Sequence, residues 1–152
     1  MPKKSVGGLR AAVMSIRMPD KTKFGLELTA RLYNETIADV LVRAANAEMS
    51  SENGGLFVDL PGEEMPVFLL PRIWDERECA RIVKLAMVYP KLLKRSEQMA
   101  WAMVRDNDKY WSGPKTKRGA APTREFDQLK ADVLEADWAE VVKAAEARAA
   151  GE

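Results

Sequence analysis

A short alternating segment stands directly before two helix-like stretches between residues 13 and 49. Successive residues of a strand point to opposite sides, so this segment has one purely apolar face and one mixed face. The apolar face consists of Met14, Ile16 and Met18, and the mixed face consists of Val13, Ser15 and Arg17. Pro19 ends the strand, expected over residues 12–18, because proline has no N–H for a ladder. Such a strand is unstable alone, so the sequence predicts a two-stranded antiparallel ribbon shared with a second copy of the chain.

Two helices are expected after Pro19, the first over Asp20–Tyr33 and the second from Thr36 to about Met49. Asn34 tolerates the left-handed conformation that commonly ends a helix. Thr36 and Asp39 then give a capping-box-like start, with Asp in place of the usual Glu or Gln. The pattern is therefore ribbon-helix-helix, and the expected fold class is mainly α.

Such a unit has to bury its apolar residues against its copy. The expected dimer core combines the apolar strand face with helix positions at helical spacing. Its residues are Met14, Ile16, Met18, Leu26, Ala30, Val40, Leu41 and Ala44. The first helix also carries Phe24, Leu28 and Leu32 on nearly the opposite side. We expect this second stripe to be covered by the C-terminal region or by a second dimer.

The charge distribution places an anionic partner at the N-terminal end of the chain. The first 23 residues contain six Lys or Arg and one acid, whereas the whole chain has a net charge of +1. A two-stranded ribbon fits the major groove of double-stranded DNA, where Arg17 can donate two hydrogen bonds to guanine and Ser15 can bond to several bases. The alternative is an edge strand of a mixed sheet with a solvated Arg17.

A flexible basic arm, residues 1–11, precedes the ribbon. Its basic residues are Lys3, Lys4 and Arg10. Arms of this kind fold over the phosphates or into the minor groove. The alternative role for the arm is solubility alone.

Residues 13–49 resemble the Arc-type ribbon-helix-helix family of bacterial and phage DNA-binding proteins. The matching features are the alternating strand, Arg17-x-Pro19, Ala30, Asn34 and Thr36-x-x-Asp39-Val40-Leu41. This resemblance covers about a quarter of the chain and implies a sequence-specific DNA-binding protein. We expect it to act as a homodimer or a higher oligomer such as a tetramer.

The resemblance also implies roles for individual residues. Val13, Ser15 and Arg17 would contact bases, and the N-terminus of the second helix, at Thr36 and Ile37, would contact a phosphate. Val13 departs from the family, which often has a polar residue there, and leaves only contact with a thymine methyl. Gly25 and Thr29 also replace larger apolar residues, so we expect readout to rest on Arg17 and Ser15 with lower specificity.

The simplest biological output is transcriptional repression in the cytoplasm. Residues from Phe24 into the second helix, Leu70-Pro71 and Arg81–Tyr89 are also similar to uncharacterised proteins of bacterial plasmids and integrative elements. The alternative function is an antitoxin, or an accessory factor in plasmid partition or transfer, whose C-terminal region binds a protein partner. A small effector bound by the helical region is a third interpretation.

Residues 50–55 are the expected linker, and residues 56–152 the expected helical region for oligomerisation or partner binding. Apolar runs at 56–60 and 65–70 are compatible with a hairpin, although Pro66 and Pro71 argue against a regular central strand. Helices are expected over 75–89, 91–105 with Leu92 inward, and 123–149. We expect the last helix to leave the body and pack on another subunit. Four tryptophans are expected in the core of this region, namely Trp74, Trp101, Trp111 and Trp138.

Composition excludes several classes of site. The chain has no His and a single Cys, Cys79, so disulfide frameworks, zinc fingers and Ser-His-Asp triads are excluded. No catalytic residue, metal or cofactor is therefore expected, and the chain is interpreted as a non-enzyme. No apolar run approaches the ~18 residues of a membrane span, so no membrane partner is expected.

Overall fold

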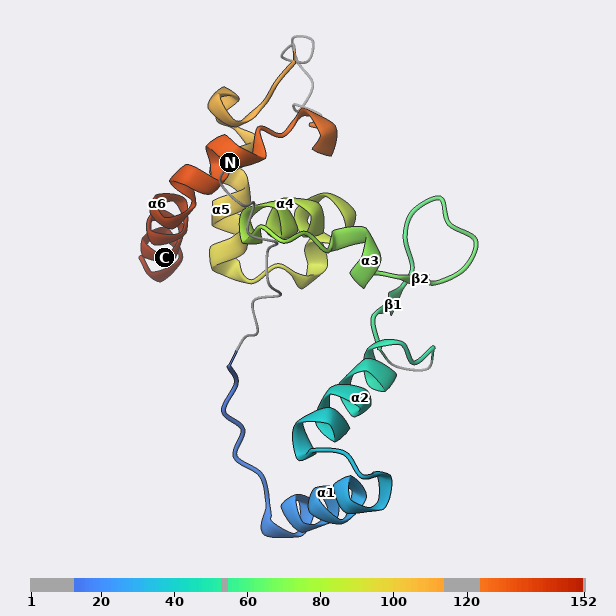
Figure 1. Cartoon of the computed structure of the whole chain (residues 1–152). Helices are drawn as coiled ribbons and strands as arrows, with labels where there is room; N and C mark the ends of the chain where they lie inside the picture. Colours follow the sequence, from blue (N-terminus) through green and yellow to red (C-terminus); the bar gives the residue numbers. More distant parts are fainter. Residues whose placement is uncertain (1–12, 53–54, 114–123, 152) are drawn as a thin grey trace, which may run out of the picture. The chain divides into compact units, whose positions relative to one another are not determined.

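The computed structural model describes residues 13–52, 55–113 and 124–151. The chain divides into two compact units, one ending at Met49 and one beginning at Ser50. The described residues are mainly helical, with one small two-stranded antiparallel sheet (Figure 1), as the sequence predicts. The arm at residues 1–11, with Lys3, Lys4 and Arg10, lies outside the described residues.

The first unit consists of an extended segment, residues 13–19, and two helices. Helix α1 spans Asp20–Tyr33 and helix α2 spans Ile37–Met49, which confirms both expected helices. Pro19 is extended, and its carbonyl accepts the Lys23 N–H at 3.0 Å. Asn34 adopts the left-handed conformation, with φ 54° and ψ 42°, and its N–H reaches the Ala30 and Arg31 carbonyls. That residue turns the chain between the two helices.

The first unit buries little apolar surface. Among its described residues only Ala30 and Val40 are buried, at 6% and 5% exposure. Isolated helices of this length are marginal in water, because most helical stability in proteins comes from packing. The unit therefore needs further packing to be stable.

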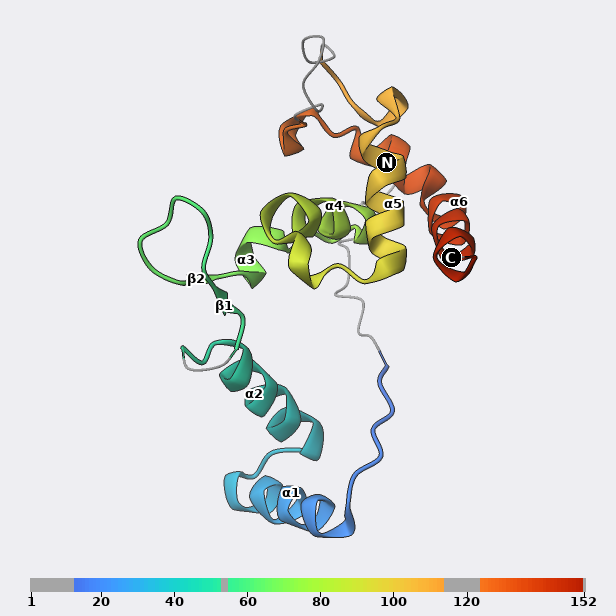
Figure 2. The same ribbon diagram turned by 180° about the vertical axis from the view of Figure 1, so that it is seen from behind.

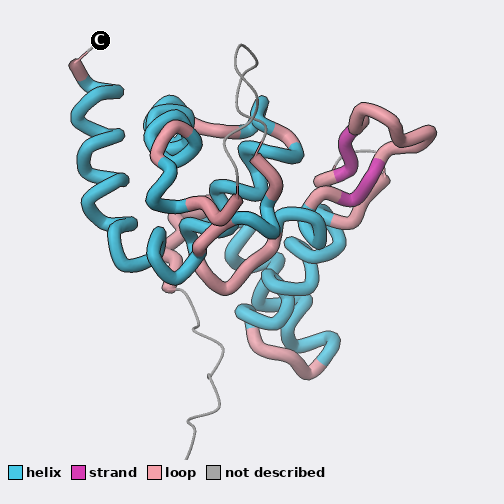
Figure 3. The backbone as a smooth tube through the Cα atoms, turned by 90° about the horizontal axis from the view of Figure 1, so that it is seen from above, coloured by secondary structure: helices cyan, strands magenta, loops and turns pink. Residues whose placement is uncertain are grey.

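The second unit begins with the hairpin that the sequence predicts (Figure 3). Strand β1, Phe57–Val58, pairs antiparallel with β2, Val67–Phe68, and the Phe57 and Phe68 rings stack at 5.3 Å. Both strands have two residues. Pro66 directly precedes β2 and Pro71 lies in the short helix α3, Leu70–Ile73, so both prolines lie outside the ladder.

The remainder of the second unit is a helical assembly. It contains the α-helices α4 (Glu78–Val88), α5 (Arg95–Arg105) and α6 (Ala131–Ala150) and the 3-10 turns η1 (Pro90–Leu92), η2 (Asp108–Tyr110) and η3 (Phe126–Gln128). Helices α4, α5 and α6 lie against one another (Figures 1 and 2). Their buried residues form one core, which consists of Cys79, Val83, Ala100, Val104, Tyr110, Trp111, Leu134, Val141 and Ala145.

The three helices predicted for this region all begin later than expected, and the one predicted from Asp75 starts at Glu78. The helix predicted from Lys91 starts at Arg95, because Lys94 is extended and its N–H donates to the Glu97 carboxylate at 2.8 Å. Leu92, predicted inward, is in fact half exposed in η1. The helix predicted from Thr123 starts at Ala131, since residues 126–128 form η3 and Trp111 bridges Leu129.

Helix α6 also differs from the prediction in its packing. It packs on α5 of the same chain and buries Leu134, Val141 and Ala145, so the expectation that it leaves the body is wrong. The physical reason is the spacing of these residues, which lie seven and four positions apart and share one helix face.

The tryptophan prediction is confirmed for three residues and wrong for one. Trp111 is buried and donates its indole N–H to the Val104 carbonyl at 2.8 Å, while Trp101 meets it edge-on. Trp138 packs against the same core. Trp74 is instead exposed, with the Arg81 guanidinium 5.0 Å from its ring centroid.

No helix in the part of the chain that the structure describes is long and apolar enough to cross a membrane.

Leu134→Ala tests the core of the second unit. Leu134 is fully buried, so we expect the substitution to lower the free energy of unfolding by about 2 to 5 kcal/mol in chemical denaturation. The matched control is Leu92→Ala at a half-exposed leucine, with an expected loss of about 1 kcal/mol or less. Equal losses in the two variants would contradict this description of the core.

Candidate nucleic-acid interface

The expected ribbon segment is extended and open to solvent. Val13 and Met14 are 98% and 80% exposed, and Ile16 is 56% exposed. The sheet seen among the described residues is β1 with β2, so residues 13–18 form no edge strand of it. Within the described ranges no backbone hydrogen bond joins residues 13–18 to another segment of the chain. The swapped ribbon involves two chains, so it stays a prediction.

The expected dimer-core residues fall into two groups in the single chain. Ala30 and Val40 are buried where α1 and α2 pack together. The others are half-buried or exposed. Met18, Leu26 and Leu41 are half-buried, whereas Met14, Ile16 and Ala44 are exposed. The apolar surface that a partner copy would have to cover is therefore present and uncovered.

The expected base-contacting residues are also accessible. Val13, Ser15 and Arg17 are all exposed. Lys21 and Lys23, in the first turns of α1, are exposed cations close to them in sequence. Both lysines belong to the basic N-terminal end of the sequence, but no contact with DNA is expected of them from the sequence pattern.

The start of α2 has the capping geometry that the sequence predicts. The Thr36 N–H donates to the Asp39 carboxylate at 3.0 Å, and the Asp39 N–H donates to Thr36 Oγ1 at 3.1 Å. Thr36 Oγ1 also donates to the same carboxylate oxygen at 2.6 Å. These hydrogen bonds from Thr36 hold the pKa of Asp39 below its ordinary value. Both ends of the capping box are therefore occupied within the chain.

The capping box reduces the number of backbone N–H groups that could bind a phosphate at the start of α2. The Thr36 N–H already has an acceptor, whereas the N–H groups of Ile37 and Ala38 have none among the described residues. Those two donors are the ones that a phosphate could meet at the positive end of α2. Ala38 is missed by the sequence analysis, and only the geometry of the cap identifies it.

The turn between α1 and α2 is held by side chains as well. The Arg43 guanidinium pairs with Glu35 at 3.0 Å and lies 4.9 Å from the Tyr33 ring centroid. Arg43 therefore has a structural role at the turn.

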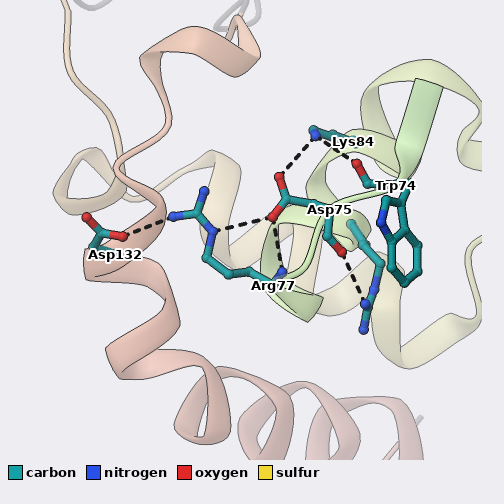
Figure 4. Close-up of polar contacts among 6 residues, drawn as sticks. Trp74, Asp75, Arg77, Lys84 and Asp132 are labelled. Atoms are coloured by element: carbon teal, nitrogen blue, oxygen red, sulfur yellow. Dashed lines mark hydrogen bonds and ion pairs between the residues drawn. The ribbon is translucent and has the colours of Figure 1, made fainter. Parts of the chain in front are cut away.

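A second polar cluster lies between α3, α4 and α6 (Figure 4). The Asp75 carboxylate accepts from the Arg77 backbone N–H and from Lys84 Nζ, each at 3.0 Å. Lys84 also donates to the Trp74 carbonyl at 3.1 Å, and the Arg77 guanidinium pairs with Asp132 of α6 at 3.0 Å. Partial burial raises the pKa of Asp75, but these donors outweigh it and hold the pKa below its ordinary value.

The arrangement of this cluster is structural. Asp75, the carboxylate of low exposure in this cluster, is paired with Lys84. The Arg77–Asp132 pair links the chain before α4 to the start of α6. No group of three or more potential metal ligands occurs among the described residues.

Asp75→Asn tests that structural role through its pH dependence. Because the folded-state pKa of Asp75 is lowered, its charge stabilises the fold above the unfolded pKa of about 3.8. This contribution is lost as the pH falls further, through the lower folded pKa. We expect Asp75→Asn to cost about 1 to 3 kcal/mol of unfolding free energy at pH 7, with the difference from the parent shrinking below pH ~4.

The control for that measurement is Asp132→Asn, since Asp132 is 97% exposed and its pair with Arg77 is expected to contribute little. A pH-independent loss at Asp75 would contradict the role of its charge.

Comparison with protein-family models, curated proteins and solved structures gives no significant match for this chain.

Proposed function

We propose that this chain is a sequence-specific DNA-binding protein that acts as a dimer, with residues 13–18 of two copies forming a ribbon in the major groove. The supporting observation is the first unit itself. It is an exposed extended segment with one apolar face, followed by two helices that bury only Ala30 and Val40 among their described residues.

A second copy would give this unit the two things that it lacks, which are hydrogen-bond partners for the backbone of residues 13–18 and cover for its apolar side chains. Antiparallel pairing of residues 13–18 gives their backbone N–H and C=O groups partners, which an isolated strand lacks. The same pairing places Met14, Ile16 and Met18 of both copies over the helices, where they add to the sparse core. One two-fold axis therefore completes the ladder and the hydrophobic core together.

The outer face of such a ribbon carries the reading groups twice. Arg17 can donate two hydrogen bonds to guanine, Ser15 can bond to several bases, and Val13 can contact a thymine methyl. The N–H groups of Ile37 and Ala38 at the start of α2 have no acceptor and could bind a phosphate. Such a contact would fix the position of the protein on the DNA without distinguishing between bases. The exposed Lys21 and Lys23 add attraction for the DNA backbone.

Repression by occupying a promoter is the simplest output of such a dimer. The second unit has its own buried core around Val83, Val104 and Leu134. A folded unit of this kind differs from the short polar tail with which antitoxins usually bind toxins. This favours a DNA-binding regulator, whose second unit serves oligomerisation or partner docking.

Ile16→Glu tests the ribbon. A carboxylate on the inward face would have to be buried without a partner, so we expect the full-length variant to sediment as a monomer where the parent sediments as a dimer. Val13→Glu is the matched control on the outward face and is expected to remain a dimer. Dimers of equal strength in both variants would contradict the ribbon.

Arg17→Ala tests base reading. The operator is first selected from random DNA at a stated salt concentration, and binding is then measured by gel shift. We expect a loss of about 1 to 3 kcal/mol on that operator, with relaxed preference at one base step. Arg72→Ala, at an exposed arginine of the second unit, is the control and should bind like the parent. Equal binding by Arg17→Ala and the parent would refute the assigned role.

A further inference from the structure

The second unit has a groove where α4, α5 and α6 come together (Figure 2). Its volume is about 170 Å³. The apolar part of its lining combines one half-buried indole with aliphatic side chains from all three helices, namely Trp138, Ile82, Ala100, Val142 and Ala145. The groove therefore offers apolar surface to an occupant on more than one side.

The charged residues of the groove are mainly acidic. Each helix contributes one carboxylate, from Glu78 of α4, Glu97 of α5 and Glu146 of α6. Lys94 is the one cation among the lining residues, so three glutamates against one lysine give a net charge of −2. Glu97 accepts from the Lys94 backbone N–H, whereas Glu78 and Glu146 are exposed and have no cationic partner among the described residues. This lining is complementary to a cation that has an apolar stem.

The volume of the groove limits the occupant to one long side chain. Pockets for small organic ligands typically measure about 300 to 1,000 Å³, and this groove lies below that range. A water molecule takes up about 30 Å³ in the liquid, so the groove has room for about six waters. That is close to the number of heavy atoms in one arginine side chain. The groove therefore suits an anchor residue of a protein partner better than a free ligand.

We propose that this groove is a docking site for a protein partner, which inserts an arginine side chain between α4, α5 and α6. The planar guanidinium stacks on aromatic rings and has enough donors for more than one carboxylate, which a lysine ammonium matches less well. Trp138 provides the ring, and Glu78 and Glu146 provide the carboxylates. Arginine is also one of the residues that most often dominate the binding energy of protein interfaces. The inference rests on the proposed function only for the docking role of the second unit and does not require DNA binding.

Trp138 provides a spectroscopic signal at the groove. Its indole N–H is buried and has no acceptor among the described residues, and its ring packs against the core of the unit. An occupant of the groove changes the surroundings of this ring. The indole resonance of Trp138 in a proton–nitrogen NMR spectrum, identified by its loss in Trp138→Phe, is therefore expected to shift on binding.

The first test titrates the full-length protein with N-acetylarginine N-methylamide and with the citrulline analogue, which has nearly the same shape but no charge. We expect the arginine compound to shift the Trp138 resonance until saturation and to bind at least about tenfold more tightly than the citrulline compound. Equal binding of the two compounds would overturn recognition of a cation. An unchanged Trp138 resonance with the arginine compound would overturn the site.

The two carboxylates are tested by the double variant Glu78→Gln, Glu146→Gln. We expect this variant to bind the arginine compound at least about tenfold more weakly than the parent, because the guanidinium loses both charged acceptors. The matched control is Glu64→Gln, Glu140→Gln, which removes two charges from exposed glutamates that do not line the groove and should bind like the parent. Equal affinities of the two double variants would contradict the assignment. Circular dichroism checks that every variant is folded.

The protein partner is tested by selection from a phage library of random peptides of about twelve residues on the immobilised full-length parent. We expect the selected peptides to share an arginine, to shift the Trp138 resonance and to lose binding to Glu78→Gln, Glu146→Gln. Peptides that share no basic residue, or that bind this variant as well as the parent, would overturn the proposal. Agmatine, a free amine with the same guanidinium group, tests the other occupant. Tighter binding of agmatine than of every selected peptide would indicate a small-amine site and would also overturn it.

Discussion

Two helices joined by a tight turn can enclose very little, and this limit governs the first unit. With Ala30 and Val40 as the buried residues of its described part, the unit leaves the apolar side of residues 13–18 and the Phe24–Leu28–Leu32 side of α1 exposed. The hydrophobic effect acts on whatever area is removed from water, so assembly is the way for such a unit to gain stability. In the proposed dimer, association and DNA reading would both follow from this small core, because the ribbon that covers the helices would present Arg17 outward.

The second unit follows a different principle, because it has enough helices to build a core of its own. Leu134, Val83 and Val104 are enclosed by α4, α5 and α6, and polar contacts close its edges. Asp75 fixes the chain before α4, while Asp137 of α6 accepts from Tyr110 at 3.0 Å. The donors hold the pKa of each carboxylate below its ordinary value. Asp75 joins the chain before α4 to Lys84 within α4, and Asp137 joins α6 to η2. This unit is therefore suited to act as a rigid body attached to the first.

Local signals in the sequence predicted the two helices of the first unit and the turn between them. Pro19, Asn34 and the Thr36–Asp39 pair each act within four residues, and the structure has α1, the left-handed turn and the cap where these residues place them. The second unit was less predictable, because Lys94 and residues 126–130 are held outside helices by Glu97, Tyr110 and Trp111. The contacts of residues 126–130 are tertiary and leave no periodicity in the sequence, whereas the Lys94–Glu97 contact is a local cap whose first residue is not one of the usual capping residues. The role of Ala38 could likewise not be predicted from the sequence, because its N–H is available only as a result of which other N–H groups bond within the capping box.

The most direct measurement of the shared ribbon is hydrogen exchange of the backbone amides of residues 14–18, followed by NMR at protein concentrations above and below the dimer dissociation constant. An antiparallel two-stranded ribbon pairs alternate N–H groups of each strand, so slow exchange at every second amide, lost on dilution, is the expected result. Uniformly fast exchange of these amides in a protein that is shown to be dimeric would contradict the account.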